Sequence, residues 1–377
     1  MKFNYSLPVN IVFGKGRVDE CGQIASEYGK KAMIVTGRSS AKKSGLYDRV
    51  KNSLEAQGME TVLFDRVTQN PLTTTAEEGA AILKAEGCDV IIAIGGGSIM
   101  DCAKAIAFLS VNDGDVNDYI FGRKTGDEAL PLVLIPTTCG TGSEGNGFAV
   151  LTNPENGDKK SLRCKAIIAK ASIVDPECMM TIPKKILASV GFDALCHNIE
   201  AYTANNAQPY TDALAKYAIE QLAKVLVPLY TGEDESLEAW EKLSYSATIG
   251  GMVIGVAGVT LCHGMEHPAS GLRNIVHGNG LAALTAPVID ATWMGCPEKF
   301  AFISQQFGGK GAEDCGDAIR ELLRKLNLNV SLTDLGVQAT DVDWMTENCF
   351  RVSAANLANT RVAVDRDLVK EIYTKAL

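Results

Sequence analysis

The four histidines of this 377-residue chain lie in two short segments whose spacing fits helices. Asp193 and His197 are spaced i, i+4, and His263 and His267 repeat that spacing, so each pair would share one face of a helix. His277 follows shortly after His267. A carboxylate and several imidazoles on rigid helices suit a divalent metal of borderline softness, Fe(II) or Zn(II). A lone histidine in such a segment is more often a core residue, but this paired arrangement predicts a metal site.

Cysteines adjoin two of these histidines, since Cys196 precedes His197 and Cys262 precedes His263. Neighbouring side chains point in different directions on a helix, so we expect both thiols to be structural. The eleven cysteines are scattered without Cys-x-x-Cys pairing, and the N-terminus shows no apolar leader. We therefore expect reduced thiols and a cytoplasmic protein.

A glycine run in the first half fits phosphate binding. It follows an apolar strand expected over residues 90–94 and reads Gly95-Gly96-Gly97-Ser98, with Asp101 and Lys104 in the helix behind it. Glycines let the backbone approach a phosphate, and a helix N-terminus offers free N–H groups and a positive dipole end. A plain strand-to-helix turn would rarely need three consecutive glycines.

A literal Gly-x-Gly-x-x-Gly occurs later, at residues 140–145. Alone this match is weak, because it lies too late for a first βα turn and lacks a clear helix behind it. We interpret residues 136–144, which include Thr137 and Thr138, as a loop of hydroxyls and backbone amides that contacts a cofactor.

The elements that must position these residues divide the chain in two. Strands are expected over 32–36, 61–64, 90–94 and 130–135, and helices over 45–57 and 75–85. This alternation predicts βαβ units with a parallel sheet, with a hairpin excursion at 152–160. After about residue 183 helices are expected over 188–202, 209–226, 237–249, 252–261 and 312–326. We predict a dinucleotide-binding α/β domain over 1–182 and a helical metal-binding and catalytic domain over 183–377.

Charge and hydropathy exclude some classes of partner. A net charge of −9 and a pI near 5.1 argue against nucleic acid or an anionic membrane as the main partner. The longest uncharged apolar run, 247–262, is too short to span a membrane and contains four glycines. We read it as a buried central helix.

Together these motifs resemble those of the iron-containing alcohol dehydrogenases, and the resemblance runs from about residue 13 to Asn359-Thr360-Arg361. It implies a Rossmann-like nucleotide-binding domain and an all-α metal-binding domain, the dehydroquinate synthase-like architecture. It implies four metal ligands: Asp193, His197, His263 and His277. His267 matches a histidine near the nicotinamide that is not itself a ligand. The cofactor positions it implies are Gly96, Gly97, Ser98, Thr137, Thr138 and Lys160, which adjoins Lys159.

Some positions depart from the family pattern. Val276 replaces a frequent proline before the last ligand, and Leu281 replaces a usual asparagine. Glu266 replaces a small residue, and we expect it to be a solvated helix residue rather than a partner of the metal site. These changes leave the predicted metal site in place but obscure the substrate pocket.

The turn after the first strand bears on the cofactor. Many family members carry aspartate at the position of Gly37, where a carboxylate would bind the adenosine 2′-hydroxyl and repel a 2′-phosphate. Glycine removes that repulsion. Arg38, Ser39, Ser40 and Lys42 could pair with the phosphate, although Arg38 and Lys42 also fit a solvated charge cluster. We predict NADP(H) in preference to NAD(H).

The reaction implied by the resemblance is reversible hydride transfer between a small primary alcohol or aldehyde and a nicotinamide, with the metal as Lewis acid. His267 is the candidate for relaying the proton, because histidine titrates near neutral pH. A homodimer is expected by analogy with the family.

Three alternatives remain open. A glycerol dehydrogenase-like enzyme would typically use fewer metal ligands than are present here. A dehydroquinate synthase-type lyase would need a basic pocket, and Arg273 is the main basic residue near the histidines. A nucleotide-binding sensor would keep the fold without turnover.

Overall fold

The computed structural model describes residues 2–377, which divide into two compact units. The sheet unit comprises Leu7–Asn156 and Lys160–Ile182. The helical unit comprises Pro183–Leu377 together with Gly157–Lys159 and the N-terminal residues up to Ser6. Two short segments from the N-terminal half thus pack with the helical unit. The boundary between residues 182 and 183 as a domain limit stays a prediction.

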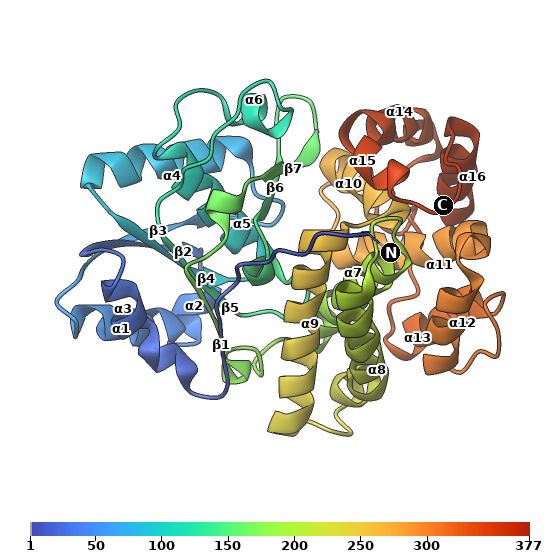
Figure 1. Cartoon of the computed structure of the whole chain (residues 1–377), viewed down its shortest axis with the longest axis horizontal. Coiled ribbons are helices and arrows are strands. Elements are labelled where there is room, and N and C mark those ends of the chain that lie inside the picture. The colour runs from blue at the N-terminus through green and yellow to red at the C-terminus, as the bar shows by residue number, and fades with distance from the viewer. Residues whose placement is uncertain (1) are drawn as a thin grey trace. The chain divides into compact units, whose positions relative to one another are not determined.

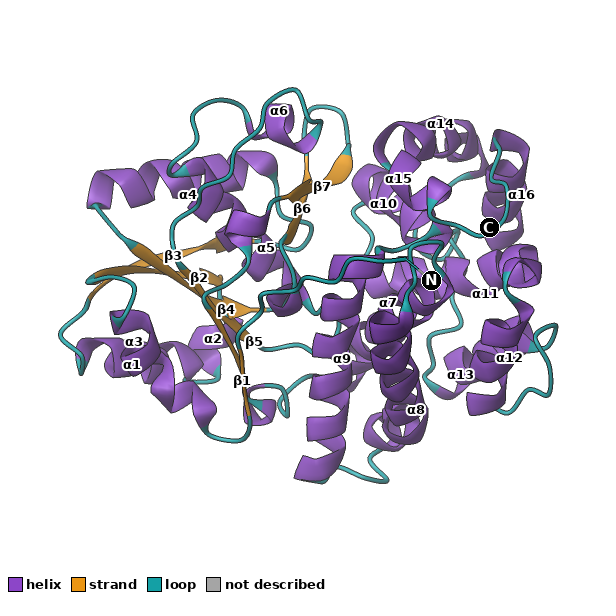
Figure 2. Cartoon of the chain, viewed as in Figure 1, coloured by secondary structure: helices purple, strands orange, loops and turns teal. Residues whose placement is uncertain are grey.

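Six parallel strands form the sheet, in the order β1-β8-β5-β4-β2-β3, and Figure 2 labels each of them except β8. They are β1 Ile11–Phe13, β2 Lys31–Gly37, β3 Glu60–Val67, β4 Val90–Gly95, β5 Leu132–Pro136 and β8 Ala171–Val174. The four strands expected from the sequence are confirmed as β2 to β5. The sequence analysis missed β1 and β8, which are only three and four residues long and pair with each other.

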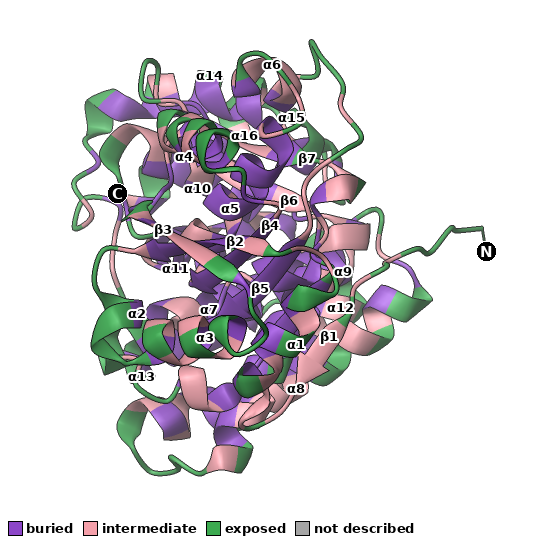
Figure 3. Ribbon diagram, turned by 90° about the vertical axis from the view of Figure 1, so that its left-hand side faces the viewer, coloured by how far each residue is buried: buried purple, intermediate pink, exposed green. Residues whose placement is uncertain are grey.

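Helices cover both faces of this sheet (Figure 1). They are α1 Cys21–Ser26, α2 Ser40–Lys43, α3 Leu46–Glu55, α4 Thr73–Glu86, α5 Gly97–Leu109 and α6 Val116–Ile120, with 3₁₀ turns η1 Arg17–Glu20, η2 Ser143–Gly145, η3 Lys165–Ile167 and η4 Pro176–Cys178. Alternate strand residues enter opposite cores. Met33 packs with α4 and α5, whereas Ile34 packs with α1 and α3. Both faces of the central strands are therefore buried (Figure 3).

A separate two-stranded sheet confirms the expected hairpin excursion. It pairs β6 Phe148–Thr152 with β7 Lys159–Arg163, on either side of a turn-rich segment.

The helical unit contains no strand among the described residues from 183 onward. Its helices are α7 Lys184–Thr203, α8 Pro209–Thr231, α9 Leu237–Ala257, α10 Leu261–Arg273, α11 His277–Thr292, α12 Pro297–Gln306, α13 Cys315–Lys325, α14 Val342–Val352, α15 Ala354–Ala358 and α16 Arg366–Ala376, with 3₁₀ turns η5 Trp293–Gly295 and η6 Ala339–Asp341. The predicted fold class, a parallel α/β half and an all-helical half, is confirmed.

The helix boundaries around residue 250 differ from the prediction. The helices expected over 237–249 and 252–261 form one helix, α9, which ends at Gly258 with a φ of 75°. The expectation was wrong because the glycines at 250 and 251 are buried inside the helix and do not break it. Asn359 Nδ2 holds the turn by donating to the carbonyls of Ala257 (2.8 Å) and Val259 (3.0 Å).

No single helix among the described residues is long and apolar enough to cross a membrane. Within residues 2–377, α9 and α10 taken together are the one pair that meets that test by length and composition, and a bend of 103° separates them. Most of α9 is buried in the helical unit.

Candidate metal centre and nucleotide site

Three helices of the helical unit bring the candidate metal ligands together around one carboxylate oxygen. Asp193 and His197 lie on α7, His263 on α10, and His277 at the first turn of α11. Asp193 Oδ1 lies 3.3 Å from His197 Nδ1, 3.7 Å from His263 Nε2 and 3.7 Å from His277 Nε2. Ligand atoms of Asp193, His263 and His277 all lie within 4.8 Å of one another.

Several of these atoms lack a partner that buried polar atoms normally have. Asp193 Oδ1, His197 Nδ1 and His263 Nε2 are buried and make no hydrogen bond within the described chain. Leaving such atoms unsatisfied costs free energy, and a cation among them would supply the missing interaction. One carboxylate and three imidazoles also match the donors that Fe(II) and Zn(II) prefer. The residues present therefore fit a metal ion of this type.

The charge states of two of these groups favour a cation. Burial alone would raise the pKa of Asp193, but His197, His263 and His277 hold it at about 2. Burial lowers the pKa of His197 to about 4, against the opposing effect of Asp193. At neutral pH Asp193 is thus ionised and His197 is neutral, which are the forms that bind metal.

Glu200 is a site residue that the sequence analysis missed. It is buried on α7, and its Oε1 lies 2.5 Å from His263 Nδ1. Its Oε2 accepts hydrogen bonds from Thr260 N (2.6 Å) and Thr260 Oγ1 (3.0 Å), so one side chain also caps the start of α10. Burial opposes it, but Glu200 and Asp193 raise the pKa of His263 to about 10, so a metal that binds His263 Nε2 must displace a proton. The sequence could have indicated this role, because a spacing of three residues places Glu200 on the same helical face as His197.

The expectation that Glu266 is solvated was wrong. Its side chain is 0% exposed, and its Oε2 lies 2.5 Å from His277 Nδ1 and 3.4 Å from Lys159 Nζ. The reason is packing: α10 is buried over most of its length, so the face that carries Glu266 meets other chain segments and not water.

His267 lies next to the candidate metal ligands but is not one of the group whose ligand atoms lie within 4.8 Å of one another. Its ring centroid is 6.3 Å from that of His263 and 5.9 Å from that of His277. Burial and, secondarily, the charge of Lys159 lower the pKa of His267 well below its usual value. The ring is therefore neutral at pH 7, which differs from the near-neutral titration assumed from the sequence. Its proton-relay role stays a prediction.

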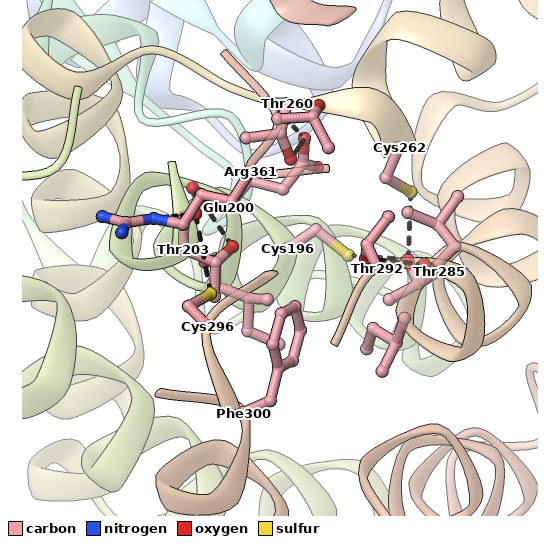
Figure 4. Close-up of a pocket in the computed structure, with 14 residues that line it drawn as sticks. Cys196, Glu200, Thr203, Thr260, Cys262, Thr285, Thr292, Cys296, Phe300 and Arg361 are labelled. Carbon is pink, nitrogen blue, oxygen red and sulfur yellow. Dashed lines mark hydrogen bonds between the residues drawn. The ribbon is translucent and has the colours of Figure 1, made fainter. Parts of the chain in front are cut away.

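Cys196 and Cys262 point at a common hydroxyl. Each Sγ lies 3.3 Å from Thr285 Oγ1, at the wall of a cavity of about 30 Å³ (Figure 4). Burial raises the pKa of both thiols well above its usual range. Both are therefore neutral thiols packed against Thr285, as expected for structural cysteines.

The candidate nucleotide residues gather at the carboxyl edge of the sheet. The register pairs Thr36 with Ile94 and Gly95 with Pro136, so the ends of β2, β4 and β5 lie side by side. The chain order reverses between β2 and β4, and such a switch point is where open α/β sheets bind ligands. The ends of these three strands and the segments directly after them carry most of the predicted cofactor residues: Gly37, Arg38, Ser39, Ser40, Gly95, Gly96, Gly97, Ser98, Thr137 and Thr138.

The glycine run is explained by a close approach of the chain. Helix α5 begins at Gly97, directly after Gly96. A Cβ on Gly96 would lie 3.0 Å from Thr138 Oγ1, and a Cβ on Gly97 would lie 2.4 Å from Thr141 Cγ2. The glycines thus let the 137–142 loop pack against the start of α5, whose terminal N–H groups can bind an anion.

Asp101 and Lys104 hold the next part of the same loop. Asp101 accepts hydrogen bonds from Ser143 Oγ (2.6 Å) and Val150 N (2.9 Å). The buried Lys104 Nζ donates to Ser143 O (2.6 Å) and Phe148 O (2.8 Å). The residues after Gly142 form a 3₁₀ turn that leads into β6, which confirms that residues 140–145 are a loop without a following α-helix. A direct cofactor contact by Asp101 stays a prediction.

Basic residues near the predicted adenosine site differ in their surroundings. Arg38 is exposed, whereas Lys42 Nζ lies 2.5 Å from Asp65 Oδ2. Lys160 lies over the ring of Phe121, with its Nζ 5.6 Å from the centroid. It is Lys159, the neighbour of Lys160, that lies beside the histidines of the helical unit.

Comparison with known proteins places the chain in a class. Residues 8–176 match the family described as iron-containing alcohol dehydrogenase, and residues 187–377 match the Fe-containing alcohol dehydrogenase family, C-terminal. The chain belongs to the iron-containing alcohol dehydrogenase family. The predicted class of enzyme, a metal-dependent alcohol oxidoreductase that uses a nicotinamide cofactor, is confirmed at this level.

Individual relatives match from 81% of the chain to all of it. A choline dehydrogenase of Bacillus subtilis is 38% identical over 81% of this chain and 76% of its own length. The NAD-dependent methanol dehydrogenase of Bacillus methanolicus is 32% identical over 98% of both. An archaeal alcohol dehydrogenase from a Red Sea brine pool has a similar solved structure, with a TM-score of 0.94 and 34% identity over 100% of this chain and 99% of that one.

Proposed function

We propose that this protein catalyses reversible hydride transfer between a small primary alcohol, or its aldehyde, and a nicotinamide cofactor. The proposed metal ligands are Asp193, His197, His263 and His277. The observation that carries this proposal is the set of buried, unpartnered ligand atoms around Asp193 Oδ1. Relatives that act on methanol and choline support a small alcohol as substrate.

The roles of the chain's residues follow from their positions. When bound, the metal supplies Lewis acidity and the nicotinamide exchanges the hydride. Asp193 contributes a negative charge at the centre of the ligand set, while Glu200 holds the ring of His263. His267, beside the cluster and neutral, is the proposed proton relay. The start of α5 and the Thr137–Thr138 pair are the proposed cofactor contacts.

Metal analysis combined with an activity assay tests this proposal. Anaerobically purified protein should bind one iron per chain and oxidise reduced nicotinamide in the presence of short aldehydes. Asp193→Asn should lose the metal, because the central carboxylate charge is gone. Asp212→Asn is the matched control, since Asp212 pairs with Lys299 (2.8 Å) in the same unit. Protein that binds neither Fe(II) nor Zn(II) and stays inactive after their addition would contradict the proposal.

Fe(II) is the proposed resident metal, and Zn(II) is the alternative because the same donor set accepts both. The family description supports iron. Metal content after purification from medium containing both ions separates the two.

We propose that NADP(H) is preferred over NAD(H). Gly37 carries no carboxylate to repel a 2′-phosphate, and Arg38 is exposed beside it. Two observations favour NAD(H) instead. Lys42 is already paired with Asp65, and the relative from Bacillus methanolicus is an NAD-dependent methanol dehydrogenase.

Gly37→Asp tests the cofactor preference. A Cβ at Gly37 would lie 3.7 Å from Val67 O, an ordinary contact, so the variant should fold. We expect kcat/KM for NADP(H) to fall roughly tenfold or more while that for NAD(H) is retained, about 1.4 kcal/mol of discrimination. Gly37→Ala is the control for the added Cβ. Equal efficiency with NADP(H) in the Asp variant and the control would contradict the preference.

A homodimer and a cytoplasmic location complete the proposal. Phe3, Tyr5 and Tyr210 form an exposed aromatic cluster, with ring centroids 5.8 and 5.1 Å from that of Tyr210. Such a patch suits a protein interface. The eleven free cysteines support a reducing compartment. Sedimentation of wild type and Tyr210→Ser measures the dimer, which the substitution should weaken.

One observation weighs against the lyase alternative. Arg273, the main basic residue near the histidines in the sequence, is paired with Asp341 at 2.6 and 2.9 Å. It does not supply a free cation for an acidic phosphate substrate.

A further inference from the structure

We infer that Glu266 is a positioning residue of the metal centre, which holds the ring of His277 so that its Nε2 faces Asp193. This inference rests on the ligand set proposed above. It assigns a role in that site to a carboxylate that stands where the family usually has a small residue.

The first argument is the geometry of the ring. Glu266 Oε2 lies 2.5 Å from His277 Nδ1, close enough for the carboxylate to attract a proton carried on that nitrogen, although the angle is not that of a hydrogen bond. The other ring nitrogen, Nε2, lies 3.7 Å from Asp193 Oδ1. A carboxylate behind a ligand histidine selects the tautomer with the proton on the far nitrogen and leaves the near one free for metal.

The second argument is that the surroundings accommodate this carboxylate. Ser270, one helical turn further along α10, donates its hydroxyl to Glu266 Oε1. Gly280 on α11 leaves the space that the side chain fills, since a Cβ there would lie 2.9 Å from Glu266 Cγ and 3.0 Å from Oε1. Two positions, Ser270 on α10 and Gly280 on α11, are thus matched to the Glu266 side chain.

The third argument is charge compensation. A fully buried carboxylate is costly unless it is paired. Lys159 Nζ lies 3.4 Å from Glu266 Oε2, and the Lys159 side chain is only 5% exposed. Lys159 belongs to the short segment Gly157–Lys159 that packs with the helical unit. The charge of Glu266 is therefore balanced without the metal, and the carboxylate can hold His277 both before and after metal binds.

The fourth argument is the parallel with Glu200. Glu200 Oε1 stands behind His263 Nδ1 at 2.5 Å, as Glu266 Oε2 stands behind His277 Nδ1. Both proposed ligand histidines outside α7, His263 and His277, thus have a buried carboxylate on the side away from Asp193. The repetition on two different helices favours a role in orientation over one in packing alone.

The test measures metal binding by Glu266→Gln, with Co(II) as the probe. The amide keeps the shape of the side chain but removes its charge. We expect Co(II) affinity, measured by chelator competition, to fall about 10- to 100-fold. We also expect the visible absorption bands of bound Co(II) to shift, because the ring of His277 is held differently. A purely structural role would leave those bands unchanged.

Asp341→Asn is the matched control. It removes a carboxylate that pairs with Arg273, a residue of α10 like Glu266, and that does not contact a histidine. Its Co(II) affinity and bands should equal those of the wild type.

If Glu266→Gln does not fold, the Gly280→Ala variant tests the same inference. The added Cβ displaces the Glu266 side chain without removing its charge, and it should weaken Co(II) binding and shift the bands in the same way. Wild-type protein that binds no metal would overturn the proposed function. If the wild type binds Co(II), unchanged bands in the folded Glu266→Gln or Gly280→Ala protein would overturn this inference alone.

Discussion

At the scale of single residues, the candidate metal centre depends on groups that would not touch the metal. Glu200 and Glu266 stand behind two histidines, and each is held in place by a further partner, Thr260 or Lys159. The sheet unit has a comparable buried group in Lys104, which supports the loop that carries the candidate cofactor residues. In both units, buried charged residues fix the position of backbone and side chains that are proposed to bind a ligand.

The pKa of Lys104 predicts how the free energy of unfolding depends on pH. Burial lowers its pKa from 10.5 to about 8. Between pH 8 and 10.5 the unfolded chain holds a proton on this amine that the folded chain has released. Stability contributed by Lys104 therefore rises with pH across that window. The free energy of unfolding of the wild type minus that of Lys104→Met should increase, by up to about 1.4 kcal/mol per pH unit.

Denaturant unfolding at a series of pH values under reducing conditions measures this difference. Other titrating groups contribute equally to both proteins and cancel. A difference that stays flat or falls between pH 8 and 10.5 would show that Lys104 remains charged in the folded protein.

At the scale of elements, the ligand set depends on how α7, α10 and α11 approach one another. Gly258 ends α9, and Glu200 caps the start of α10, so the segment that carries His263 begins at a fixed point on α7. Gly278 brings the start of α11 against α7, because a Cβ there would lie 2.2 Å from Ser189 O. These close approaches bring His277 to the carboxylate of α7.

Gly278→Ala should therefore affect both stability and metal binding. The new Cβ would collide with backbone and not with a flexible side chain, so α11 and α7 must move apart. We expect a loss of about 1–3 kcal/mol in the unfolding free energy of the metal-free protein. Co(II) affinity should fall as well, because His277 and Asp193 lie on the two helices that separate. Wild-type values in denaturant unfolding and Co(II) titration would refute this account of the helix contact.

At the scale of the whole molecule, the metal would join three helices that are distant in sequence. Binding to the folded chain alone adds stability in proportion to RT ln(1 + [metal]/Kd). The candidate ligands all lie in the helical unit, so that unit should gain the stability.

Metal removal should lower the thermal midpoint of unfolding. At a free metal concentration about 1,000 times Kd, the lost stability is roughly 4 kcal/mol, which corresponds to about 10 °C for a unit of this size. Calorimetry before and after anaerobic chelation measures the shift, and added Zn(II) or Fe(II) should restore it. Asp193→Asn should show no shift, whereas an equal shift in that variant would place the stabilising metal elsewhere.

The sequence by itself determined what depends on local spacing. The i, i+4 pairs at 193/197 and 263/267 predicted helices, and α7 and α10 bear this out. The glycine run at 95–97 was expected to join a strand to a helix and to bind phosphate; β4 runs into α5 there, and phosphate binding stays a prediction. Periodicity specifies which residues share a face, because helix and strand geometry repeats over a few residues.

Only the tertiary structure decided which faces are buried and what they meet there. Glu266 reads as a surface residue in its local sequence, but Lys159, more than a hundred residues earlier, pairs with it inside the helical unit. The short strands β1 and β8 form because they pair with each other, although they are far apart in the sequence. Burial and long-range pairing depend on contacts between distant segments, and no local pattern encodes them.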